Sequence, residues 1–179
     1  MSDIVIIEKV VRPERVLTGS WLEVIASNLD YHRATFLWKC EGLTDAQLRQ
    51  RSVPSSDLTL LGLMRHLQGV ERYWLQLKLA DTTPQFFPYQ SYITADGGEW
   101  FDETDPTPAH EVYADYLAAC EDSRALFTNG TRNVPRTVPN PEFGDTDVRF
   151  ILAHVIEEYA RHLGHADLLR QSLDGTTGE

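Results

Sequence analysis

The stretch from His154 to Leu169, HVIEEYARHLGHADLL, carries the residues of this chain that are best suited to metal chemistry. If the stretch is helical, Glu158 and His162 lie one turn apart, at the edge of the apolar face of that helix. Burying a carboxylate without a partner costs several kcal/mol. A divalent metal bound by both side chains would supply the compensating charge, but it requires at least one more ligand.

A second stretch with helical periodicity offers that ligand. His66 falls between the apolar residues Leu63 and Val70. The polar residues of this stretch fall on the other side of the helix: Arg65, Gln68, Arg72 and Gln76. Two histidines and one carboxylate on inward faces form a set that helical bundles use for metals, and it leaves coordination positions open for water or substrate. On spacing alone, His66 could instead be a core histidine hydrogen-bonded to backbone or to a tyrosine.

The remaining histidines are secondary candidates. His32 falls on the apolar stripe of the first helical stretch and could be a fourth ligand, a pocket base or a packed core residue. His154 and His165 lie further round toward solvent than the inward pair, where they would contact either the ligands or water. His32 and His165 are the candidate catalytic residues, as proton shuttles or as pocket residues. His110 is predicted to lie on the surface.

Four stretches have the apolar spacing of long helices, with a period of about 3.6 residues. They run from about Gly19 to Glu41, from Leu58 to Ala80, from Ala109 to Asn129-Gly130, and from a cap at Asp145 or Thr146 to Asp174-Gly175. Thr44 is the predicted N-cap of a short helical piece between the first two. The sequence therefore predicts an all-α protein.

Two irregular segments separate the later helices. Residues 81–105 contain six aromatic residues, two prolines and two glycines, which favours an ordered surface loop between the second and third helices. Residues 131–145 contain three prolines and link the third helix to the fourth. With no repeat or linker, the prediction is one domain over residues 1–179: a four-helix bundle with a long irregular loop.

Composition narrows the possible partners. The net charge of -11 would repel phosphate backbones and anionic membranes, which argues against nucleic acid and membrane partners. Cys40 and Cys120 show no motif spacing and are predicted to be reduced packing residues. The apolar stretch near the N-terminus is too short for a signal peptide or a membrane span, so a cytoplasmic location is expected.

Three motifs, FLWKCEGLTDAQL, LTLLGLMRHLQGVERYW and HVIEEYARHLGHADLLRQSLDGTTGE, resemble the DinB-like superfamily of bacterial four-helix metalloproteins. The closest likeness is to the branch called domain of unknown function 664. The resemblance implies a metal held by one histidine of the second helix and an HxxxH pair of the last. Here Glu158 takes the first place of that pair. The implied triad of His66, Glu158 and His162 is similar to that of mycothiol-dependent maleylpyruvate isomerases.

The resemblance implies a metal-dependent enzyme that acts on a small-molecule substrate, with zinc ranked first and nickel or iron as alternatives. Related enzymes use a low-molecular-weight thiol, such as mycothiol or bacillithiol, in S-transfer or isomerisation reactions. Two other functions stay open: a metal-dependent hydrolase using the same ligands, and a non-enzymatic binding or stress-response module contacting partners through residues 86–101. A homodimer is expected, because Trp21, Leu37 and Trp38 lie off the main apolar stripe of their helix.

Overall fold

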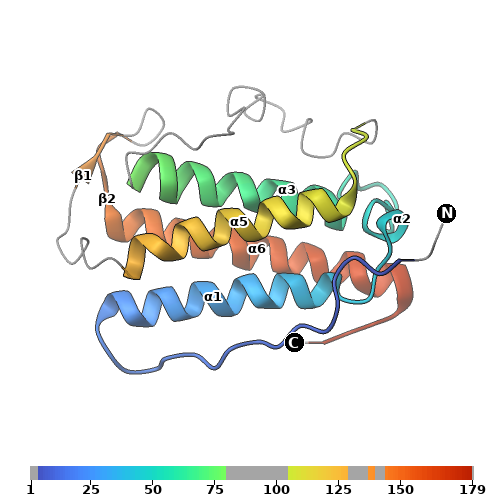
Figure 1. Ribbon diagram of the computed structural model, residues 1–179, viewed down its shortest axis with the longest axis horizontal. Helices are drawn as coiled ribbons and strands as arrows, with labels where there is room; N and C mark the ends of the chain where they lie inside the picture. The colour runs from blue at the N-terminus through green and yellow to red at the C-terminus, as the bar shows by residue number, and fades with distance from the viewer. Residues whose placement is uncertain (1–3, 80–104, 129–136, 140–143, 179) are drawn as a thin grey trace.

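The computed structural model describes residues 4–79, 105–128, 137–139 and 144–178, and within them four long helical segments form the body of the protein (Figure 1). The helical elements are α1 (Trp21–Cys40), α2 (Asp45–Leu48), α3 (Leu60–Val70), the π-helix η1 (Glu71–Leu79), α5 (Ala109–Thr128) and α6 (Val148–Asp174). The strands β1 (Thr137–Val138) and β2 (Thr146–Asp147) pair antiparallel before α6. The predicted all-α fold is confirmed. The predicted long loop lies almost entirely outside the described residues.

Side-chain caps fix where the first helices begin. Ser20 and Glu23 form a reciprocal capping box at the start of α1. Thr44 caps α2 as predicted, again in a capping box, here with Gln47. The Thr59 hydroxyl accepts from the third backbone N–H group after it and starts α3. The last of these caps fixes the start of α3, the helix that carries His66.

Helix α6 begins later than predicted. Its N-cap is Asp147 rather than Asp145 or Thr146. Thr146 belongs to β2 and pairs with β1, so the chain stays extended for one residue longer than the helical pattern suggests. The helix ends as predicted at Gly175, whose φ of 78° is the left-handed conformation that favours glycine.

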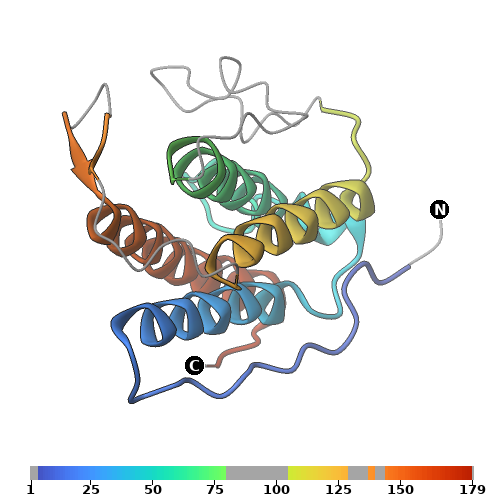
Figure 2. The ribbon, with the colours of Figure 1, turned by 60° about the vertical axis from the view of Figure 1, so that its left-hand side comes forward.

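The four long segments enclose one apolar core. Helix α1 packs along α6, and α3 packs against both α5 and α6, an arrangement visible in the two ribbon views (Figures 1 and 2). Each segment contributes fully buried side chains to a single cluster, including Leu29, Phe36, Leu63, Leu67, Tyr116, Ile151 and Val155. Because α3 and α6 are neighbours, residues on their facing sides can meet within the bundle.

The helix that carries His66 differs from the predicted one in two ways. It is not a regular α-helix throughout, because α3 passes directly into the π-helix η1. Arg65 and Gln76, predicted to lie on the other side of the helix from the apolar residues, are buried as well. The Arg65 guanidinium pairs with Asp105 at 2.9 Å, and the Gln76 amide donates to the Ala119 carbonyl at 3.0 Å. Both partners are distant in sequence, and a projection of one helix cannot show them.

The segment before α1 runs extended beside that helix (Figure 1). Two backbone hydrogen bonds fasten it to the turn after α1: the Ile6 N–H donates to the Leu43 carbonyl at 3.0 Å, and the Gly42 N–H donates to the Ile7 carbonyl at 2.9 Å. In the parts of the chain that the structure describes, no helix combines the length and the apolar character needed to cross a bilayer.

Candidate metal centre

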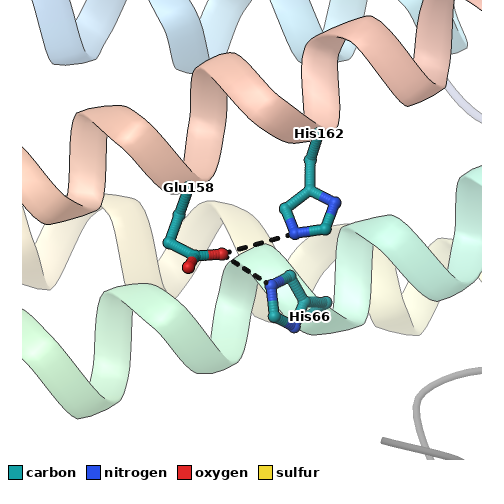
Figure 3. A group of neighbouring side chains, drawn as sticks. All are labelled: His66, Glu158 and His162. Carbon is teal, nitrogen blue, oxygen red and sulfur yellow. Dashed lines mark hydrogen bonds and ion pairs between the residues drawn. The ribbon is translucent and has the colours of Figure 1, made fainter.

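His66, Glu158 and His162 converge between α3 and α6, with His66 on the first helix and the other two one turn apart on the second (Figure 3). The Glu158 Oε2 atom lies 3.1 Å from His66 Nε2 and 3.3 Å from His162 Nε2. The two imidazole centroids are 4.4 Å apart. The structure therefore brings these three predicted side chains together.

The spacing of the three side chains fits a divalent metal ion. One ligand atom from each residue lies within 4.8 Å of the other two. In a tetrahedral site with zinc bonds of about 2.1 Å, neighbouring ligand atoms are about 3.4 Å apart. The observed separations of 3.1 and 3.3 Å are close to that value. Two imidazole nitrogens and one carboxylate oxygen also leave at least one coordination position for an exogenous ligand.

The electrostatics of the cluster favour the protonation states that bind metals. Hydrogen bonds from His162 and then His66 hold the pKa of Glu158 well below its usual range, against the opposing effect of burial. Burial lowers the pKa of His162, and this outweighs the attraction of Glu158 for its charged form. Near neutral pH the carboxylate is therefore anionic and the His162 imidazole neutral, as ligation requires.

The cluster is sheltered but reachable. The side chains of His66, Glu158 and His162 are 24%, 13% and 12% exposed. His154 lies beside them, with its Nε2 atom 3.6 Å from Glu158 Oε1, so it contacts a ligand, one of its two predicted alternatives. Its ring stands edge-on to Trp74, with centroids 4.6 Å apart. His154 is therefore near the Glu158 oxygen Oε1, whereas the two candidate histidine ligands face Oε2.

The two candidate catalytic histidines lie in different surroundings. The His165 Nδ1 atom is 3.2 Å from His162 Nδ1, so His165 touches the cluster through one of its members. The His32 Nδ1 atom lies 2.7 Å from the Asn28 carbonyl oxygen of its own helix. Among the described residues, no hydrogen bond, ion pair or ring contact joins His32 to the cluster.

Sequence reasoning missed a buried ion pair inside the bundle. Arg33 and Glu71 are 2% and 0% exposed, and the Arg33 Nε and Nη2 atoms donate to the two Glu71 oxygens at 2.8 and 2.5 Å. The Tyr159 hydroxyl donates to Glu71 Oε1 at 2.8 Å. This network joins α1, η1 and α6. One signal was available: Arg33 is four residues after Leu29 and three before Phe36, on the apolar stripe of α1.

The two cysteines do not contribute to a reactive site. Cys40 and Cys120 are both buried and both unpaired, as the sequence predicts. Burial raises the pKa of each thiol to about 12. Since the thiolate is the nucleophile in cysteine chemistry, neither side chain is poised to act as one near neutral pH.

A family model described as mycothiol-S-transferase matches residues 24–175, from within α1 to the end of α6. The chain belongs to the mycothiol-S-transferase family. This family is DinB-like, so the resemblance found in the sequence motifs is confirmed. The match contains all three residues of the cluster. No curated protein matches the chain at a significant level.

Proposed function

We propose that this protein is a metal-dependent transferase whose co-substrate is mycothiol. In this proposal His66, Glu158 and His162 hold a divalent ion, for which zinc is the first candidate. The observation that carries the proposal is the cluster of three ligand-type side chains inside a bundle of the mycothiol-S-transferase family. A small electrophile is the expected second substrate.

The state of the protein's own thiols supports an external sulfur nucleophile. The sequence contains two cysteines, and both are buried with raised pKa values. The sulfur that attacks the electrophile would therefore belong to a substrate. A bound divalent ion lowers the pKa of a thiol coordinated to it and so supplies thiolate near neutral pH.

The residues around the cluster have distinct parts in this proposal. Glu158 contributes one negative charge, while His66 and His162 bind as neutral imidazoles. With a divalent ion the site keeps a net positive charge, which favours an anionic sulfur over a neutral ligand. The His154 Nε2 atom lies 3.6 Å from Glu158 Oε1 and would contact the carboxylate oxygen that faces away from the histidine ligands. A proton-shuttling part for His32 or His165 stays a prediction.

Metal content and thiol consumption test the proposal together. The purified protein should contain or take up one zinc ion, measured by elemental analysis and chelator competition. With mycothiol and 1-chloro-2,4-dinitrobenzene it should catalyse formation of a carbon–sulfur bond, with loss of chloride and of the thiol proton. The rate should disappear on chelation and return with zinc.

Two variants separate a specific site from adventitious binding. His66→Ala should lose the metal and the activity, because it removes the sole ligand supplied by α3. His110→Ala is the matched control, since that histidine is 68% exposed on α5 and should leave both unchanged. Full metal content in His66→Ala would disprove the site. Stoichiometric zinc without any metal-dependent thiol loss would instead favour the hydrolase or the non-enzymatic module.

We further propose that the protein is a cytoplasmic homodimer. Trp21 is 38% exposed, which supports an apolar contact surface on α1. Trp38 supports it less, because the Arg12 guanidinium lies over its ring, 4.4 Å from the centroid. Light scattering should give twice the chain mass of 20.4 kDa, and a value equal to one chain would contradict the dimer.

A further inference from the structure

His162 contacts two different partners through its two ring nitrogens. Its Nε2 atom faces Glu158 Oε2 at 3.3 Å, and its Nδ1 atom faces His165 Nδ1 at 3.2 Å. The His162 and His165 ring centroids are 5.2 Å apart. Both histidines lie on α6, three residues apart, so the contact between them is fixed by the geometry of one helix.

The metal-free protein has one consistent placement of protons. An ionised carboxylate can only accept hydrogen bonds, so His162 must donate to Glu158 from Nε2. At a pH where both His162 and His165 are neutral, each imidazole carries one proton. His162 Nδ1 is therefore an acceptor, and the proton between the two Nδ1 atoms belongs to His165.

Binding of a metal ion at Nε2 of His162 would reverse this arrangement. A ligating Nε2 atom uses its lone pair for the ion, so the single proton of His162 must move to Nδ1. His165 Nδ1 then has to accept where it previously donated, and its own proton moves to Nε2. Each imidazole has one proton before and after, so the change needs no net proton uptake or release by the pair.

We propose that His165 is the positioning residue of the metal centre, and that metal binding switches the tautomers of His162 and His165 together. The inference rests on the proposed metal site and adds a part for His165 that differs from proton shuttling. Ligand histidines are held in place by an acceptor on their second nitrogen, and loss of such a partner typically weakens metal binding by about 10–100-fold.

Two substitutions at position 165 test the positioning part through zinc affinity, measured by chelator competition. His165→Leu removes the partner at similar size and should weaken zinc binding by about 10–100-fold. His165→Asn keeps both a donor and an acceptor, because its amide can present either, so it should restore most of that loss. His110→Leu is the matched control and should bind zinc like the unsubstituted protein, because His110 is exposed on another helix.

Nitrogen NMR of the unsubstituted protein tests the switch without any variant. Long-range proton–nitrogen spectra with and without zinc should show the His162 proton moving from Nε2 to Nδ1 and the His165 proton from Nδ1 to Nε2. An unchanged His165 tautomer on zinc binding would overturn the inference, as would a His165→Leu protein with full zinc affinity. Absence of zinc binding by the unsubstituted protein would overturn the proposed site itself, which keeps the two failures distinct.

Discussion

Replacing Glu71 by leucine should destabilise the fold by about 3–5 kcal/mol, because it leaves the Arg33 guanidinium charged and buried without its main partner. Arg33 is 2% exposed and donates two hydrogen bonds to Glu71. Its remaining carboxylate partner is Asp30, at 2.9 Å, which Arg124 also contacts at 2.8 Å. A shared and partly exposed carboxylate cannot replace a fully buried one.

The predicted loss is a large share of the total stability of a domain, which is typically about 5–15 kcal/mol. The double variant Arg33→Met with Glu71→Leu should recover most of it, since replacing a buried ion pair by apolar residues is often close to neutral. Tyr159 loses its acceptor in both variants but keeps Tyr116, whose hydroxyl oxygen is 3.0 Å from its own.

Urea unfolding of the metal-free protein, followed by circular dichroism, measures these differences. The four free energies of unfolding, for the unsubstituted protein, Arg33→Met, Glu71→Leu and the double variant, form a double-mutant cycle. A coupling energy above about 2 kcal/mol is expected for residues in such a network. The interpretation of Arg33 and Glu71 as a mutually dependent buried pair is wrong in either of two cases. One is that Glu71→Leu lowers the free energy of unfolding by less than about 1 kcal/mol. The other is that the losses of the two single variants add up to the loss of the double variant.

Three further predictions concern thiols, pH and a helix cap. Cys40 and Cys120 should resist alkylation by iodoacetamide in the native protein at pH 8 and both react in urea, as counted by mass spectrometry, because burial raises their pKa values to about 12. The metal-free fold should lose stability on acidification. The unfolded chain takes up a proton on His162 near pH 6.5 and on Glu158 near pH 4.5, in each case before the folded protein does. The urea midpoints should therefore fall from pH 8 to pH 6 to pH 4, and the fall between pH 8 and pH 6 should be smaller for His162→Gln. Asp147→Ala should cost about 1 kcal/mol through loss of the α6 cap, a fall of about 2–4 °C in calorimetric Tm.

Much of the fold and the candidate cluster could be predicted from local patterns. Helix positions follow from apolar spacing and caps, and the inward direction of Glu158 and His162 follows from their place relative to Val155 and Tyr159 on one helix. A projection at the α-helical period applies to His66 because α3, up to Val70, has regular α-helical geometry. These residues are determined by the helix to which they belong.

The features that local patterns did not predict depend on contacts between helices. Glu71 opens a π-helix, where a projection based on the α-helical period no longer applies. The burial of Arg65 depends on Asp105, and that of Gln76 on a carbonyl of α5. The pairing of Arg33 with Glu71 spans 38 positions of sequence. No spacing rule within a single helix contains such information.

The uneven origin of the three candidate ligands has a consequence for the integrity of the bundle. Glu158 and His162 belong to α6, as do the neighbouring His154 and His165, so these four residues keep their mutual spacing when α6 moves as a unit. His66 alone joins them from α3. In the proposed centre the ion would therefore link α3 to α6, and its binding free energy would stabilise the packing of these two helices by mass action. A rise in metal concentration would then lower the equilibrium fraction of molecules in which α3 and α6 are locally separated, and it would leave the fraying of other parts of the bundle unchanged.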